Sequence, residues 1–152
     1  MLRNEPPFQA LRLRRLSLNA PVNAMAFCSD LRCRASLEEL IVYNSALDTA
    51  RAMGALVNAF IPLQLRKFNL FFCRVVPAAL PELTRLIAAG TSRDLYVLNH
   101  GVDMFDEADE STQLFVTAVR ASAMTWLSLN AFGYAPQSVV EAAAFVNARQ
   151  QL

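Results

Sequence analysis

Apolar and polar side chains alternate in five short segments of the chain. When the segments are aligned on residues 13, 37, 65, 92 and 124, an apolar residue stands at the fourth and the sixth position of each. This alternation is typical of a β-strand, in which every second side chain points to the same face. The fourth and sixth positions hold Leu16 and Leu18, Leu40 and Val42, Phe68 and Leu70, Leu95 and Val97, and Leu127 and Leu129.

A second apolar spacing fills the intervals between these segments. Apolar residues recur there three and four positions apart, which is the spacing that buries one face of an α-helix. Residues 24 to 34 give a weaker pattern of the same kind. Helix starts are expected near Asp48, Pro77 or Pro81, Ser111 and Gln137. The apolar stripes are Met53, Leu56, Val57 and Phe60; Leu80, Leu83, Leu86 and Ile87; Leu114, Phe115, Ala118 and Val119; and Val139, Ala142, Ala143 and Val146.

The unit Leu-x-x-Leu-x-Leu, repeated at intervals of 24 to 32 residues, resembles the leucine-rich repeat of the ribonuclease-inhibitor-like subtype. The resemblance covers about residues 10 to 150. It implies an α/β fold, a curved solenoid of about five strand–helix units with a parallel sheet on the concave face and helices on the convex face. Because no single unit can bury its apolar face alone, residues 1–152 are expected to form one array.

The ninth position of the unit is Asn or Cys in the family pattern and differs in most units of this chain. Only Cys73 matches the pattern, while Ser45 and His100 carry polar atoms that can bond to the backbone of a turn. The first and last units are expected to be irregular at this position, as terminal repeats often are. The five residues are Pro21, Ser45, Cys73, His100 and Phe132.

Positions three, five and seven of each unit are expected to face away from the helices. Apolar and aromatic residues gather at the fifth and seventh positions of the middle three units, and Ser or Asn stands there in the first and last units, at Ser17, Asn19, Ser128 and Asn130. An exposed aromatic centre with a polar rim is typical of a protein-binding hot spot. Self-association or cover by flanking residues are the alternatives. The predicted partner-binding residues are Ile41, Tyr43, Phe71, Tyr96 and Leu98, with Asn69 and Trp126 as additions.

Two further expectations follow from the same register. Phe72, at the eighth position, is expected to pack inward. The third-position row alternates in charge, which favours lateral pairing between neighbouring strands at roughly 0.2–1 kcal/mol for each pair. That row is Arg15, Glu39, Lys67, Asp94 and Trp126.

Composition narrows the class of partner. The net charge of +1 argues against nucleic acid, whose binding requires many Lys and Arg contacts. Uninterrupted apolar stretches are too short for a membrane span, and the N-terminal residues lack the apolar region of a secretory signal. The three cysteines Cys28, Cys33 and Cys73 make an odd number without a C-x-x-C pair, which is typical of reduced, buried cysteines and favours a cytoplasmic location.

Catalytic and metal-binding patterns are weak. His100 is the single histidine, and a Cys73/His100 nucleophilic pair lacks a third group to orient the imidazole. We therefore expect no enzyme activity, no metal and no cofactor. An acidic run before the third helical stripe is expected to be a solvated lead-in to that helix, and the alternative is a loop that contacts a basic partner. The run is Asp103, Asp106, Glu107, Asp109 and Glu110.

The sequence thus predicts an adaptor-like module that binds another protein on its concave sheet. The alternative is a truncated or self-associating fragment of a longer leucine-rich-repeat protein, such as a receptor, an effector or a ubiquitin-ligase substrate adaptor. Leu127–Leu129 has no evident covering element in the sequence, so homo-oligomerisation through this open strand edge is part of that alternative.

Overall fold

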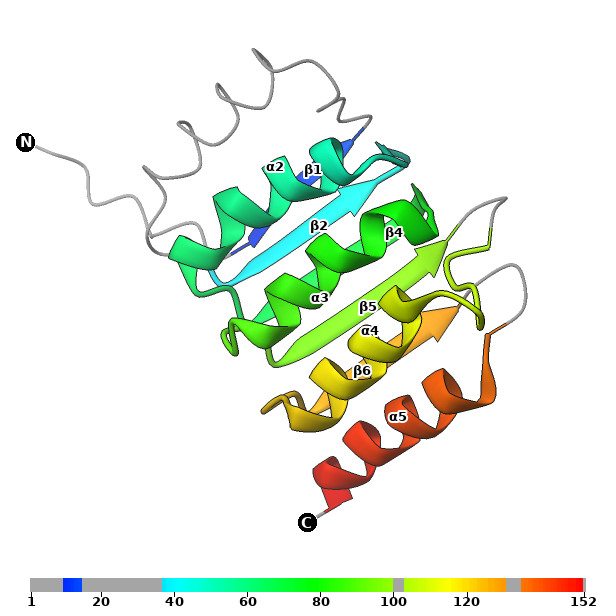
Figure 1. The fold of residues 1–152 in the computed structure, drawn as a ribbon. Coiled ribbons are helices and arrows are strands. Elements are labelled where there is room, and N and C mark those ends of the chain that lie inside the picture. The colour runs from blue at the N-terminus through cyan, green and yellow to red at the C-terminus, as the bar shows by residue number, and fades with distance from the viewer. Residues whose placement is uncertain (1–9, 15–36, 100–102, 131–134, 152) are drawn as a thin grey trace, which may run out of the picture.

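The computed structural model describes residues 10–14, 37–99, 103–130 and 135–151. Within these residues, a parallel sheet runs through five strands, each next to the strand of the neighbouring unit (Figure 1). A short strand, β3 (Ala46–Leu47), pairs with the end of β4. The five strands are β1 (Ala10–Arg14), β2 (Glu39–Tyr43), β4 (Lys67–Val75), β5 (Asp94–Asn99) and β6 (Trp126–Asn130).

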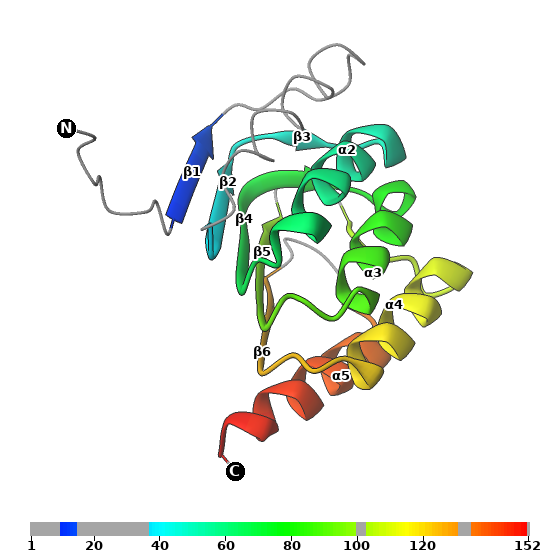
Figure 2. The same ribbon diagram turned by 90° about the vertical axis from the view of Figure 1, so that its left-hand side faces the viewer.

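Helices alternate with the strands along the chain and give the fold its second layer. The described helices α2, α3 and α4 lie on one face of the sheet, and α5 follows β6 at its end (Figure 2). The predicted α/β class with a parallel sheet is therefore confirmed. The weak pattern at residues 24 to 34 lies outside the described residues. The helices are α2 (Ala50–Phe60), α3 (Leu80–Ala88), α4 (Glu110–Ala121) and α5 (Gln137–Ala148), with short 3-10 turns at Ile61–Leu63, Pro77–Ala79 and Arg149–Gln151.

The hydrophobic core lies between the sheet and the helices and is built from the fourth and sixth positions. Phe68, in the central strand, is fully buried, and its ring meets Phe60 of α2 edge-on with centroids 5.1 Å apart. Burial of each large side chain contributes about 1.5–3 kcal/mol. The same two rows also bury Leu40, Val42, Leu70, Leu95, Val97 and Leu127.

Helix starts lie close to the expected positions. Thr49 caps α2, because its Oγ1 accepts a hydrogen bond from the Ala52 amide at 3.0 Å. Asp109 caps α4 in the same way by accepting from the Ser111 amide at 3.0 Å. The caps are thus one residue after the expected Asp48 and two before the expected Ser111.

The strand register confirms the predicted alignment in the last four units and corrects it in the first. Leu11 and Leu13 align with Leu40 and Val42, so the first unit begins five residues earlier than expected. The leucines at 16 and 18 repeat the same spacing as those at 11 and 13, and the sequence pattern alone selected the wrong pair. This register gives the third, fifth and seventh positions of the first unit to Ala10, Arg12 and Arg14, and not to the expected Arg15, Ser17 and Asn19. Residues 15–36 lie outside the described residues.

An extra residue in two strand ends changes which side chains turn inward. Asn44 and Phe72 adopt left-handed backbone conformations, with φ of 46° and 53°, and each precedes a buried residue. The next unit lacks this extra residue, because Phe71 aligns with Leu98 and Cys73 with Asn99. Asn99, and not His100, therefore occupies the ninth-position row; His100 itself lies outside the described residues.

Buried polar groups in this row bond to the backbone of the neighbouring unit. Asn99 accepts from the Val75 amide through Oδ1 at 2.7 Å and donates to the Val75 carbonyl through Nδ2 at 2.8 Å. The Cys73 thiol donates to the Val42 carbonyl at 3.4 Å. These bonds satisfy backbone groups at the point where the strands end.

The end of the sheet is covered in part by α5, contrary to the expected open edge. Asn147 accepts from the Leu127 amide and donates to the Leu127 carbonyl, both at 2.8 Å. Arg149 donates to the carbonyls of Ser122 and Met124 at 2.6 and 3.0 Å. The side chains of α5 thus take the place that a further strand would occupy at Leu127.

Candidate functional site

Three aromatic rings form a continuous row across the face of the sheet that the described helices leave open. Tyr43 of β2 stacks on Phe71 of β4 with centroids 5.2 Å apart and planes inclined by 16°. Phe71 in turn meets Tyr96 of β5 at 4.8 Å and 32°. All three side chains are half-buried. Because each ring supports the next, this aromatic row is held in place before any partner binds.

Polar neighbours fix the flanks of the aromatic row. Asn130 donates through Nδ2 to the Tyr96 hydroxyl at 3.3 Å, and Asn69 donates through Nδ2 to Glu39 Oε1 at 3.0 Å. Leu98 aligns with Phe71 in the register and is half-buried. The structure therefore brings five of the seven predicted partner-binding residues together or into adjoining positions: Tyr43, Asn69, Phe71, Tyr96 and Leu98.

The other two predicted residues have different surroundings. Ile41 is only 7% exposed, so the expectation that it offers open apolar area is wrong. It is buried outside the main hydrophobic core, on the aromatic face of the sheet. Trp126 is 41% exposed at the start of β6, where it aligns with Asp94. It is available to a partner at one margin of the face.

The third-position charges do not pair laterally as expected. Among the described residues, no ion pair joins Lys67 to Glu39 or Asp94. Glu39 instead accepts from Asn69, and Asp94 accepts from the Thr125 hydroxyl at 3.1 Å. These two carboxylates are thus bonded to neutral donors and not to Lys67.

Phe72 was expected to pack inward and is instead 49% exposed. Its left-handed backbone interrupts the strand alternation, so Phe71 keeps its place in the aromatic row while Cys73 turns inward. A left-handed conformation costs a non-glycine residue about 1–2 kcal/mol. The sequence contains one sign of this left-handed backbone. Asn44 stands at the same position of the preceding unit, and Asn tolerates the conformation.

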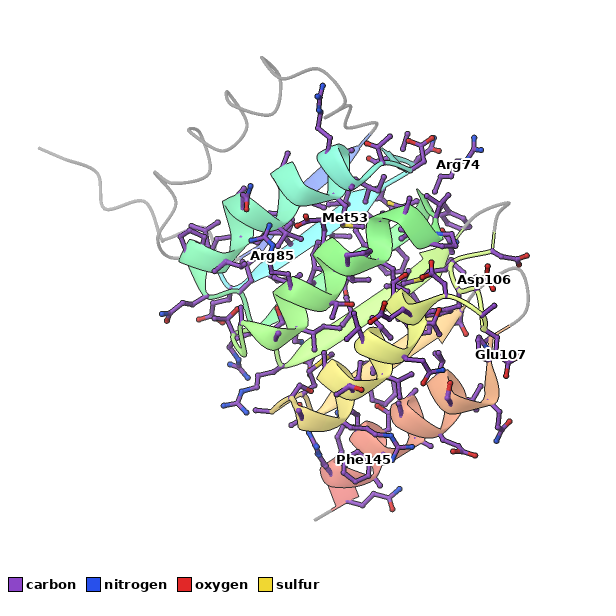
Figure 3. The ribbon with its side chains drawn as sticks, viewed as in Figure 1. Met53, Arg74, Arg85, Asp106, Glu107 and Phe145 are labelled. Atoms are coloured by element: carbon purple, nitrogen blue, oxygen red, sulfur yellow. The ribbon has the colours of Figure 1, made fainter. Side chains whose placement is uncertain are left out.

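An acidic segment lies at the edge where the strands end. Asp103, Asp106 and Glu107 are exposed, whereas the intervening Met104 and Phe105 are buried, with the Phe105 ring 5.3 Å from that of Phe115. The apolar pair thus fixes the segment to the core while its acids face outward. Asp106 and Glu107 lie along the same side of the molecule as Arg74 (Figure 3).

The surroundings of Asp109 and Cys73, two groups near this edge, shift the pKa of each from its usual value. The amide and hydroxyl of Ser111 hold the pKa of Asp109 below its usual value, so this cap is ionised at neutral pH. Burial raises the pKa of the Cys73 thiol to about 11, although hydrogen bonds with the backbone at Ser45 and Phe71 partly oppose the rise. The thiol is therefore protonated at neutral pH and is a poor nucleophile.

Neither a metal cluster nor a membrane-spanning segment is found in the part of the chain that the structure describes. No group of three His, Cys, Asp or Glu side chains there is arranged to hold a metal ion. No helix in the same ranges is both long and apolar enough to cross a membrane. Searches against protein-family models, curated proteins and solved structures found no match for the chain.

Proposed function

We propose that this chain is a leucine-rich-repeat solenoid, related to the ribonuclease-inhibitor-like subtype, and that the aromatic row on its concave sheet binds a partner protein in the cytoplasm. The observation that carries the binding proposal is the stacked row Tyr43–Phe71–Tyr96 on the face opposite the described helices. The architectural part is supported by sequential parallel strands in register and by Cys73 and Asn99 in the ninth-position row.

Physical chemistry favours this surface as a docking site. Aromatic side chains provide a large contact area and lose little conformational freedom on binding, particularly when they are already stacked. Trp126 adds exposed apolar area on the same face, and polar groups such as Asn69 and Asn130 flank the rings. An apolar centre with a polar margin is the composition of a specific protein interface. Recognition, and not catalysis, is the activity that these groups support.

The proposal is tested by comparing partners recovered with the wild type and with single variants Tyr43→Ala, Phe71→Ala and Tyr96→Ala. The matched control is Leu114→Ala, because Leu114 is 54% exposed on α4, on the helical side. Circular dichroism and thermal unfolding establish that each variant is folded. We expect the same proteins to be recovered with the control and lost with the three variants. Recovery of identical partners with folded row variants would contradict the proposal.

A second candidate, self-association, is favoured by a different observation. Val140 and Phe145 of α5 are 48% and 46% exposed at the end of the array. Since Asn147 occupies the backbone groups of Leu127, association is expected through the outer side of α5 and not through the strand edge. Light scattering over a range of concentrations tests it: a dimer lost in Val140→Lys supports self-association, and a monomer at every concentration excludes it.

A further inference from the structure

Charge is distributed unevenly along the strand direction. The parallel arrangement places helix N-termini near the strand ends and helix C-termini near the strand starts, and a helix dipole favours acids at the first and bases at the second. Among the described residues, α4 follows this rule with Glu110 in its first turn and Arg120 in its last. Among the described residues, the side of the strand ends carries Asp48, Asp103, Asp106, Glu107, Asp109 and Glu110 against three cations, Arg14 at the end of β1, Arg51 and Arg74.

The two sides also differ in whether their charged side chains are bonded within the chain. At the strand starts, Arg93 donates to the Ala123 carbonyl at 2.9 Å and Arg149 bonds to three carbonyls of its own chain. At the strand ends, Arg74 faces Asp48 at 4.0 Å. Asp103 and Asp106 have no ion-pair partner among the described residues, and Asp106 accepts a hydrogen bond from the neutral Ala108 amide. Among the described residues, the strand-end side therefore keeps an excess of negative charge.

Phe72 places an exposed aromatic ring at this same end of the strands. Phe72 directly follows Phe71 of the aromatic row and stands two residues before Arg74. Arg74 lies on the same side of the molecule as Asp106 and Glu107 (Figure 3). The preceding unit has Asn44 at the equivalent position, and Asn adopts the left-handed conformation at lower cost. An exposed aromatic residue with a left-handed backbone, at the same end of the strands as the acidic residues, is therefore a candidate anchor for a ligand.

We propose that the partner protein docks through an extended basic segment. An apolar side chain of this segment rests on Phe72 and the aromatic row, and its neighbouring Lys or Arg residues face Asp103 and Asp106. Opposite charges across the interface steer the encounter and exclude acidic competitors. The inference rests on the proposed function, because the aromatic row supplies the rest of the contact.

The experiment uses a phage-displayed library of random peptides, because an extended peptide is a recurring form of protein ligand. The library is selected on the immobilised full chain, and the affinity of each enriched peptide is measured for four variants. These are Phe72→Asn, the double variant Asp103→Asn/Asp106→Asn, Phe71→Ala, and the charge-matched control Glu38→Gln/Glu141→Gln, whose acids are exposed elsewhere.

We expect enriched peptides to carry Lys or Arg next to an aromatic or aliphatic residue. Their affinity should fall roughly tenfold or more in Phe72→Asn and several-fold in the double Asp variant. It should also weaken as salt is raised, because the charges are exposed. The charge-matched control should bind as the wild type does. Since Asn suits the backbone at this position, loss of binding in Phe72→Asn cannot be attributed to unfolding if thermal unfolding is unchanged or raised.

Any of the following results would overturn the inference. Enriched peptides that are acidic or uncharged, or a selection that enriches nothing, exclude a basic segment. Peptides that need Phe71 but bind Phe72→Asn and the double Asp variant normally leave the proposed function standing and remove its extension to the strand ends. Peptides that depend on none of these residues contradict both. A concentration-dependent dimer in sedimentation that is abolished by Phe72→Asn identifies a second copy as the occupant instead.

Discussion

Phe72 and Asn44 adopt the same left-handed backbone conformation, which Asn tolerates far better than Phe does. Both have a left-handed backbone at the end of a strand, yet Asn can bond to its own local backbone there and Phe cannot. Because the ring of Phe72 is exposed, it packs little against the hydrophobic core. Its presence is therefore a local cost to stability, and such costs are often found at functional surfaces.

The substitution Phe72→Asn should raise the free energy of unfolding by roughly 0.5–1 kcal/mol, because it relieves part of the left-handed penalty. Urea denaturation measures the change. Phe71→Asn is the control and should lower stability, since the ring of Phe71 is stacked between two others. A clear loss of stability in Phe72→Asn would show that its ring contributes more through packing than its backbone costs.

Burial of Cys73 gives a pH dependence with a defined sign. The folded state raises the pKa of this thiol from 9.0 to about 11 and so holds its proton more tightly than the unfolded chain does. The resulting stability is fully present below about pH 9 and is lost as the pH rises through about 11. Relative to Cys73→Ala, the free energy of unfolding of the wild type should fall by roughly 2 kcal/mol across this window. Parallel denaturation curves for both proteins would contradict the assignment.

At the scale of the elements, two asparagine side chains join one element to the backbone of another. Asn99 bonds both backbone groups of Val75 across to β4, and Asn147 does the same for Leu127 from α5. Each side chain replaces hydrogen bonds that the sheet ladder cannot provide at that place. Asn99 therefore contributes to register at the strand ends, and Asn147 contributes by covering the last strand.

Replacement of Asn99 by Ala should lower the free energy of unfolding by about 2–4 kcal/mol, because two buried backbone groups lose their partners. The amide and carbonyl of Val75 are both affected. Asn58→Ala is a suitable control, since Asn58 is exposed and bonds only the exposed Arg85 in the described contacts. Equal effects of the two substitutions in urea denaturation would indicate that the Asn99 bonds contribute no more than surface contacts do.

These elements differ, for physical reasons, in how far their structure follows from the sequence. The core rows were predictable because their burial follows strict alternation, as Leu95 and Val97 show. The first unit was misplaced because two leucine pairs fit the same pattern. Phe72 was missed because a left-handed residue breaks the alternation on which the prediction depended. The exposure of Ile41 was predicted wrongly, because the alternation of a strand shows which face of the sheet a side chain lies on but not whether other residues cover it there.

For the whole molecule, each described strand and helix packs chiefly against its neighbours in the sheet or helical layer. If the proposed solenoid is correct, stability should therefore vary along the chain. Leu95 and Leu127 occupy the same position of their units and are both 1% exposed. Leu95 lies in β5, between β4 and β6, whereas β6 pairs with β5 alone among the described strands. The same substitution therefore probes an inner and an outer unit.

Leu95→Ala should lower the free energy of global unfolding by about 2–5 kcal/mol, because a cavity forms between two units that hold the array together. Leu127→Ala should act more locally, raising amide exchange chiefly in β6 and α5 while β2 and β4 stay protected. Native-state hydrogen exchange followed by mass spectrometry distinguishes the two patterns. If Leu127→Ala raises exchange equally in β2, β4 and β5, the array unfolds as one unit, and the nearest-neighbour behaviour expected of a solenoid does not apply to this chain.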